Sequence, residues 1–427
     1  MPTTSRHRAR NERFLPILIV LLPCLSLASG AAIASGAASA MPLLAASGPA
    51  ATISPPLVFG PTFEMRLRNE QVDDDGFARK ADATTLRLRL GYRTRSHAHV
   101  SGLVELEATQ HLGSENFNST ANRRSAYPAV VDPDNAELNQ AYVQWAPSAK
   151  TQLRAGRQRL TWDNQRFIGN SGWRQNEQTF DALDLQQRGP GGWQWRYGYL
   201  ARALRVNGSD NPNVNLARWL LDAHLLGASH ALGRGTLTGY AYFIENHTLP
   251  ATSHRDLGLR YTARRERPGG IGWLATAEFA RQDPYADGSA NIGANYHLLE
   301  GGVLLHGNTI KAGWERLGGN GRLGFATPLA TLHAFNGWAD RFQSTPADGL
   351  DDRYLGWNRK FGKLDATVAW HDFRAVRGDV HFGTETDASL GWAFRPHWSA
   401  LAKLADFHAG DVGADVRKTW LGVEYAR

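Results

Sequence analysis

Cysteine is nearly absent from the chain. The one cysteine, Cys24, lies in an apolar run near the N-terminus and follows Pro23, whereas a lipid-acceptor cysteine would follow a small residue. A single cysteine forms no intramolecular disulfide, and after removal of that run none is left for thiolate catalysis or for a cysteine-ligated zinc or iron–sulfur site. These classes of site are therefore excluded from the mature chain.

Long apolar runs and blocks of like charge are also missing. Beyond residue 40, no stretch approaches the ~20 consecutive apolar residues that a membrane helix needs. The formal net charge is +7, and it falls to +4 when the four arginines and one glutamate of residues 1–40 are set aside. Because this excess is small and forms no basic run, a nucleic-acid partner is not expected.

The N-terminus has the three parts of a secretory signal. Basic residues from Arg6 to Arg13 precede an apolar run, Phe14 to Leu27, and a small-residue ending, Ala38-Ser39-Ala40. This layout predicts a signal peptide over residues 1–40, and an uncleaved anchor is the alternative. Residues 41–60 are rich in Ala, Ser and Pro and are expected to be a disordered leader, followed by one domain over 61–427.

From residue 61 onward the chain alternates apolar and polar residues. In the segment 84–95, even positions from 86 to 92 are leucine or tyrosine, and odd positions from 87 to 93 are arginine or glycine. Successive side chains of a strand point to opposite faces, so one face is apolar and the other cationic. Eighteen strands are predicted, with no long helical stretch between them: 62–70, 84–95, 98–110, 137–146, 150–161, 180–187, 192–203, 216–229, 236–245, 255–264, 271–282, 294–305, 309–317, 351–360, 363–373, 383–394, 398–407 and 415–427.

The connections alternate between short and long without exception. Turns such as Ser96-His97 and Phe361-Gly362 are followed by loops such as 111–136 and 318–350. This sorting, with an even strand count, is typical of outer-membrane barrels with tight periplasmic turns and long external loops. We therefore expect an all-β, transmembrane, antiparallel up-and-down β-barrel of about 18 strands in the outer membrane of a Gram-negative bacterium. A soluble propeller or sandwich, the alternative, is not expected to sort its loops in this way.

The last predicted strand resembles the closing strand of such a barrel. Thr419, Leu421, Val423 and Tyr425 occupy alternate positions, although the chain stops at Arg427 and not at the customary aromatic residue. The expected partners are outer-membrane lipid and the barrel-assembly machinery, and the barrel is expected to be a monomer.

Several phrases of the sequence resemble the alginate export family of outer-membrane porins. They are 163–185 (DNQRFIGNSGWRQNEQTFDALDL), 137–141 (ELNQA), Gly156-Arg157-Gln158, 324–340 (GFATPLATLHAFNGWAD) and 349–354 (GLDDRY). The resemblance covers nearly the whole mature chain and implies an eighteen-stranded barrel that passes an anionic sugar or polysaccharide through an arginine-studded lumen. The family's founding member is expected to have a long periplasmic loop near its C-terminal end, where this chain has only the turn 395–397. The resemblance therefore does not fix alginate as the cargo.

Basic side chains on the inward face are the candidate pore lining. A guanidinium stays charged and offers a planar fork of donors, so a ladder of arginines can pass an anion from site to site. The alternative is that acidic residues of the same face, such as Glu64 and Glu107, pair with these cations and stiffen the wall. The predicted pore-lining residues are Arg66, Arg68, Arg87, Arg89, Arg93, Arg154, Arg196, Arg260 and Lys311.

The loop after the fifth predicted strand, 162–179, is a candidate constriction. Folded into the lumen, it could present Arg166 and Arg174 to the cargo and Trp173 as a stacking face for a sugar. The alternative is a loop that buries its polar groups against the barrel wall. No metal site is expected, because the acidic run 73–75 lacks the ligand spacing of a calcium loop.

Catalytic motifs are not found. None of the fifteen histidines lies in His-Glu-x-x-His, and no serine lies in Gly-x-Ser-x-Gly. A nucleotide-binding Gly-x-x-x-x-Gly-Lys-Ser/Thr motif is missing as well, so no cofactor is expected and transport is expected to be passive. The predicted function is an outer-membrane channel for anionic sugars or polysaccharide. The alternatives are a broad-specificity porin for small solutes and an outer-membrane enzyme or adhesin built on the same wall.

Overall fold

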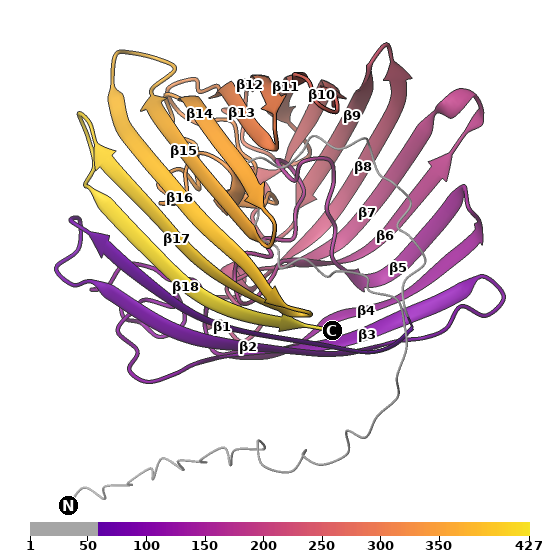
Figure 1. The fold of residues 1–427 in the computed structure, drawn as a ribbon, viewed down its shortest axis with the longest axis horizontal. Helices are drawn as coiled ribbons and strands as arrows, with labels where there is room; N and C mark the ends of the chain where they lie inside the picture. Colours follow the sequence, from indigo (N-terminus) through magenta and orange to yellow (C-terminus); the bar gives the residue numbers. More distant parts are fainter. Residues whose placement is uncertain (1–58) are drawn as a thin grey trace, which may run out of the picture. The chain divides into compact units, whose positions relative to one another are not determined.

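A computed structural model describes residues 59–427. The expected signal peptide, 1–40, and the leader up to residue 58 lie outside the described residues. The described chain forms one antiparallel sheet of eighteen strands (Figure 1). The strands are β1 (Gly60–Asp74), β2 (Ala81–Arg93), β3 (Val100–His111), β4 (Asn135–Ser148), β5 (Thr151–Gln158), β6 (Thr179–Arg188), β7 (Gln194–Leu204), β8 (Arg218–Leu232), β9 (Gly235–Asn246), β10 (His254–Arg265), β11 (Gly272–Pro284), β12 (Ala294–Leu305), β13 (Asn308–Leu317), β14 (Leu350–Phe361), β15 (Leu364–Arg374), β16 (His381–Arg395), β17 (Trp398–Ala409) and β18 (Val416–Ala426).

Each of the eighteen predicted segments coincides with one strand, and the ends differ by four residues or fewer. Within residues 59–427 the helical elements are single turns, and no helix is long and apolar enough to cross a membrane. They are η1 (Pro190–Gly192), α1 (Val214–Ala217), η2 (Pro250–Thr252) and η3 (Leu332–Ala334).

The sheet closes on itself. Each strand pairs with its neighbours in sequence, and β1 also pairs with β18, from Glu64 opposite Ala426 to Asp74 opposite Val416. At the end of this seam, the Phe63 N–H donates to the Arg427 carbonyl over 2.9 Å. Closure leaves no unpaired sheet edge, which is the condition for placing strands in lipid. The predicted closed up-and-down barrel is confirmed, with the C-terminal segment as its closing strand.

The alternation of the sequence becomes two chemically different faces. On β10 and β11, the outward Leu259 and Phe279 are 52% and 46% exposed, while the inward Arg260 and Glu278 are each 6% exposed. The same alternation on β2 places its leucines outward and Arg87 and Arg89 inward. The apolar outward band is suited to contact lipid, and the polar residues face the lumen.

The two ends of the barrel differ in their connections (Figure 1). The turns at one end are short: only Pro396 and His397 separate β16 from β17, and Gly362 adopts a positive φ of 59° in the β14–β15 turn. The other end carries the long loops, including 112–134, 159–178 and 318–349. By the rule for outer-membrane barrels, the short turns are periplasmic and the long loops external.

Long loops fold into the barrel and build its core. Gly169 of loop 159–178 donates its N–H to the Leu329 carbonyl over 2.9 Å, so this loop is tied to loop 318–349. Phe167 from the first loop and Phe325 from the second pack against Tyr296 of the wall, with ring centroids 5.7–6.0 Å apart. The buried apolar cluster therefore lies inside the closed sheet, between the loops and the inward wall.

The outward band generates a first prediction. Leu259→Arg should lower the free energy of unfolding by about 2–4 kcal/mol, because it puts a charge on the lipid face near mid-strand. Denaturant titration of the protein folded in liposomes measures this, with Leu259→Ile as the volume-matched control. Equal stabilities of the two variants would show that this face does not contact hydrocarbon.

Candidate functional site

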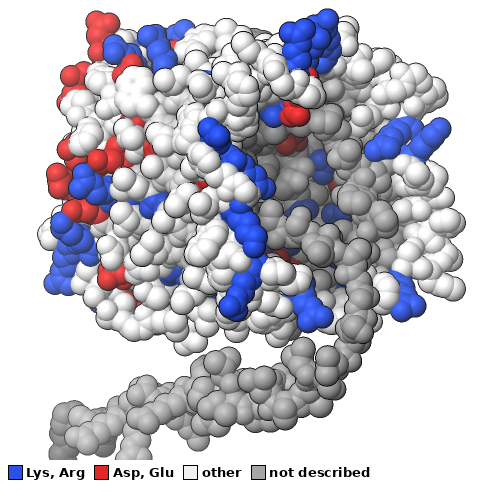
Figure 2. All heavy atoms as spheres, in the orientation of Figure 1, with Lys and Arg blue, Asp and Glu red and all other residues white. Residues whose placement is uncertain are grey.

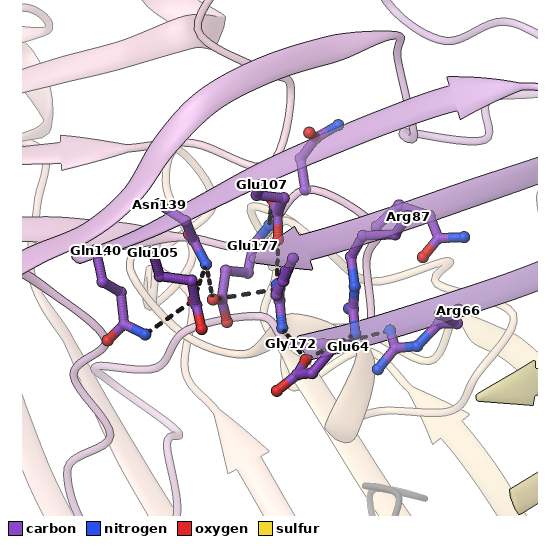
Figure 3. Close-up of polar contacts among 12 residues, drawn as sticks. Glu64, Arg66, Arg87, Glu105, Glu107, Asn139, Gln140, Gly172 and Glu177 are labelled. Carbon is purple, nitrogen blue, oxygen red and sulfur yellow. Dashed lines mark hydrogen bonds and ion pairs between the residues drawn. The ribbon is translucent and has the colours of Figure 1, made fainter. Parts of the chain in front are cut away.

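A cluster of charged side chains lies on the inward face of β1 and β2 (Figure 3). Arg66 of β1 is directly opposite Arg87 of β2 in the register. Glu64 accepts hydrogen bonds from Arg87 Nη2 over 3.2 Å and from Arg89 Nη1 over 3.1 Å. Arg66 Nε donates to Glu424 of β18 over 2.7 Å. Because inward and outward side chains alternate on β1 and β2, three guanidinium groups come together beside the β1–β18 seam.

Loop 159–178 completes this cluster from within the lumen. Asn139 of β4 donates to Glu177 over 2.6 Å, and Arg89 Nη2 lies 3.2 Å from the same carboxylate. Burial alone would raise the pKa of Glu177, but Arg159 and Arg89 outweigh it and hold this pKa well below its ordinary value. Glu177 therefore remains a carboxylate and binds the loop to the wall.

Arg87 is the least satisfied cation of the cluster. Its side chain is fully buried, and Nε and Nη1 have no hydrogen-bond partner among residues 59–427. Arg66 and Arg89 lie on either side of it, so cations outnumber its one direct acidic partner, Glu64. A buried donor without a partner costs about 1–3 kcal/mol, so an anion that reached Arg87 would relieve this cost.

All nine predicted pore-lining residues lie on the inward face, and seven of them form ion pairs with a carboxylate. Arg154 instead donates to Gln144 over 3.2 Å and lies 4.7 Å from the Tyr142 ring centroid, while Arg93 shares the inward face of β2. The ion pairs are Arg66 with Glu424, Arg68 with Asp132, Arg87 and Arg89 with Glu64, Arg196 with Asp184, Arg260 with Glu278, and Lys311 with Glu300. Six of these seven cations thus pair with carboxylates of the wall, and Arg68 pairs with Asp132 of loop 112–134. Charged side chains are visible inside the hollow in Figure 2.

The three predicted constriction residues are buried and do not face open lumen, which corrects one of the two expectations for their loop. Arg166, Trp173 and Arg174 are 2%, 5% and 6% exposed. Arg166 Nε donates to Glu315 of β13 over 2.7 Å, and Arg174 Nη2 donates to Asp340 over 2.9 Å. These side chains fasten the loop to the inward wall and to loop 318–349.

Lys403 of β17 contacts residues of both inner loops, 159–178 and 318–349. Its ammonium lies 4.2 Å from the Trp173 ring centroid and 3.6 Å from that of Trp338, and it donates to His333 Nε2 over 2.7 Å. The Trp173 and His333 rings stack with centroids 4.6 Å apart. One lysine of the wall therefore holds residues from both inner loops through cation–π contacts and a hydrogen bond.

His333 acts as a neutral bridge. Its Nδ1 lies 2.8 Å from Asp340 Oδ1, and its Nε2 accepts from Lys403. Burial lowers the pKa of His333 well below its ordinary value, with Lys403 adding to this effect and Asp340 opposing it. A neutral imidazole protonated at Nδ1 can satisfy both neighbours at once.

Several of these residues were not predicted as site residues. Asn139 and Glu177 lie within the phrases 137–141 and 163–185, and His333 and Trp338 lie within 324–340. Their position in these family-like segments was the one sequence feature that could have marked them as site residues. Lys403 lies outside them, and only the structure brings it to the loops.

One group among the described residues has metal-ligand chemistry. Ligand atoms of Asp222, Glu245 and His247 lie within 4.8 Å of one another. Asp222 and Glu245 are on the outward face of β8 and β9, away from the lumen cluster. Exposed groups of this type are common without an ion, so we assign no metal to it.

The family model described as alginate export matches residues 56–253, from just before β1 to η2. This match confirms the resemblance over residues 56–253, which include the Arg66, Arg87 and Glu177 cluster, and the phrases 324–340 and 349–354 lie beyond it. No curated protein matches the chain by sequence.

Solved barrels of similar fold include OccAB4, OccK9 and OpdK. Acinetobacter baumannii OccAB4 has a TM-score of 0.66 at 15% identity, covering 88% of this chain and 100% of that one. Pseudomonas aeruginosa OccK9 (OpdG) has a TM-score of 0.69 at 16% identity, covering 86% and 97%. P. aeruginosa OpdK, solved with vanillate, has a TM-score of 0.66 at 13% identity, covering 87% and 100%. These likenesses support the fold.

The closed barrel and the family match together identify an outer-membrane β-barrel protein that acts as a channel.

The loop fastening generates a second prediction. Trp173→Ala should lower the free energy of unfolding by about 3–5 kcal/mol, the usual cost of removing a buried aromatic side chain. It should also raise single-channel conductance, because loop 159–178 loses its contacts with Lys403 and His333. Trp193→Ala, at a periplasmic turn and 41% exposed, is the control. If the two variants have the same conductance and stability, Trp173 does not hold the constriction.

Proposed function

We propose that this outer-membrane channel conducts negatively charged sugars or oligosaccharides passively, with inward basic residues selecting the anion. The observation that carries the proposal is Arg87, a buried guanidinium between Arg66 and Arg89 with two unpartnered nitrogens among the described residues. The alginate export resemblance supports an acidic saccharide as the cargo class. OpdK was solved with vanillate, a carboxylate, so a barrel of this fold can take an organic anion.

Selection by this cluster requires exchange of partners. An incoming carboxylate would accept hydrogen bonds from the planar fork of an arginine, while Glu64 and Glu424 compete for the same donors. Such competition keeps each contact weak, and weak successive contacts are what allow an ion to leave as well as enter a pore. The proposed pore-lining set extends this path to Arg154, Arg196, Arg260 and Lys311.

A second candidate function is a broad porin with little charge preference. It is favoured by the ion pairs that involve seven of the nine predicted pore-lining cations, because a paired cation contributes little net field. The two candidates differ in the sign and size of the ionic selectivity and can be separated by electrophysiology.

The third prediction concerns this selectivity. In a planar bilayer with a salt gradient, the wild-type reversal potential should indicate anion preference. Arg87→Gln should reduce the anion-to-cation permeability ratio by roughly threefold, equivalent to about 0.6 kcal/mol. The control is Arg359→Gln, an outward arginine at the periplasmic end of β14. A wild-type channel without preference, unchanged by Arg87→Gln, would support the broad porin.

The cargo class is tested separately. Oligomers of a uronic acid should block the wild-type current at lower concentration than neutral oligomers of equal length, since only the former present carboxylates to the arginines. Equal blocking concentrations would argue against an acidic saccharide even if small anions are preferred.

A further inference from the structure

Three exposed arginines lie on the outward face near the external end of the barrel, and each makes the same kind of contact. Arg281 of β11, Arg353 of β14 and Arg374 of β15 each donate through Nε to an aspartate two positions away on the same strand. The pairs are Arg281 with Asp283 at 2.9 Å, Arg353 with Asp351 at 3.0 Å, and Arg374 with Asp372 at 2.8 Å. On β14 and β15 the register places Arg353 opposite Asp372 and Arg374 opposite Asp351. We call these three arginines the outward arginine row.

The two members of each pair differ in burial. The arginine side chains are 45%, 61% and 53% exposed, whereas their aspartates are 26%, 10% and 12% exposed. Each aspartate therefore lies against the wall and accepts from Nε. Among residues 59–427, the only hydrogen bond from the terminal amino groups of these arginines is Arg281 Nη1 to Asn295, at 3.2 Å. The row thus presents guanidinium donors that the wall itself does not use.

The outward residues next to these arginines indicate the depth of the row in the membrane. Phe279 on β11 and Leu355 on β14 are the next outward residues toward the middle of the barrel, 46% and 54% exposed. On β15, Asp372 and then Trp370, which is 45% exposed, follow Arg374 along the same face. Apolar side chains at that position contact acyl chains, so the arginines above them lie at the depth of the lipid headgroups. Guanidinium groups bind phosphate oxygens in bidentate geometry, and headgroup phosphates of the outer leaflet lie at this depth.

We propose that the outward arginine row is a docking surface for the phosphate groups of a phosphorylated outer-leaflet lipid. The bound lipid is expected along β11–β15. It is not expected at the same end of β1, β2 and β3, where the outward positions are Gln71, Asp82 and Gln110, which offer no cation. This inference does not depend on what the channel conducts.

The fourth prediction uses diphosphoryl lipid A and its dephosphorylated form as probes. Native mass spectrometry of the purified barrel in detergent would count bound lipid for the wild type, for the triple variant Arg281→Gln, Arg353→Gln, Arg374→Gln, and for Arg359→Gln. Arg359 is the matched control because it lies on β14, on the same outward face, at the opposite end, with its guanidinium 4.6 Å from the Phe361 ring centroid. Single variants of the row serve if the triple variant folds poorly, as judged by heat-modifiable migration.

The wild type and Arg359→Gln should bind diphosphoryl lipid A equally and the dephosphorylated form weakly. The triple variant should bind diphosphoryl lipid A at least about tenfold more weakly, because each basic residue near an anionic lipid surface contributes roughly fivefold in affinity. Excess inorganic phosphate should not displace the lipid, since its acyl chains also contact the wall; displacement would assign the row to free phosphate. Binding that is indifferent to the lipid's phosphates, or equal in the triple variant and the wild type, would overturn the proposal.

Discussion

The pairing of every strand on both sides is the constraint on which the rest of the structure depends. In lipid, an unpaired backbone group has no water to bond, so the sheet must close, and here the β1–β18 ladder closes it. Once the backbone is fully paired, only side chains are free to distinguish inside from outside. Strand geometry alternates the facing of side chains, so the closed sheet puts Leu259 and Phe279 outside and Arg260 and Glu278 inside.

The interior charges have two functions that compete. Arg89 contacts Glu64, Glu107 and Glu177, and so joins neighbouring strands to an inner loop. The same groups define the field that a solute meets. Because buried ion pairs are stabilised only when their geometry is complete, much of the lumen charge serves the architecture. The positive charge that is left to attract a passing anion is concentrated where cations outnumber carboxylates, as around Arg87.

Strand positions and facing directions could be predicted because period-two alternation and turn length are local properties of the sequence. The inward placement of Arg66, Arg87 and Lys311 follows from that period alone. The roles of Arg166, Trp173 and Arg174 could not be predicted in this way. Their partners Glu315, His333 and Asp340 are more than 130 residues away, and a loop has no period that fixes where its side chains point. The conformation of the loop decides whether these side chains face a solute or fasten the loop to its neighbours.

Loop 159–178 spans the seam of the barrel from inside. Arg66 of β1 donates to the Gly172 carbonyl over 3.1 Å, and Trp173 packs edge-on against Trp420 of β18 with centroids 5.7 Å apart. The first and last strands are therefore clamped together by a bridge that does not belong to either. A solute inside the lumen has no sideways exit into the bilayer at this junction, and its route through the protein runs along the barrel axis.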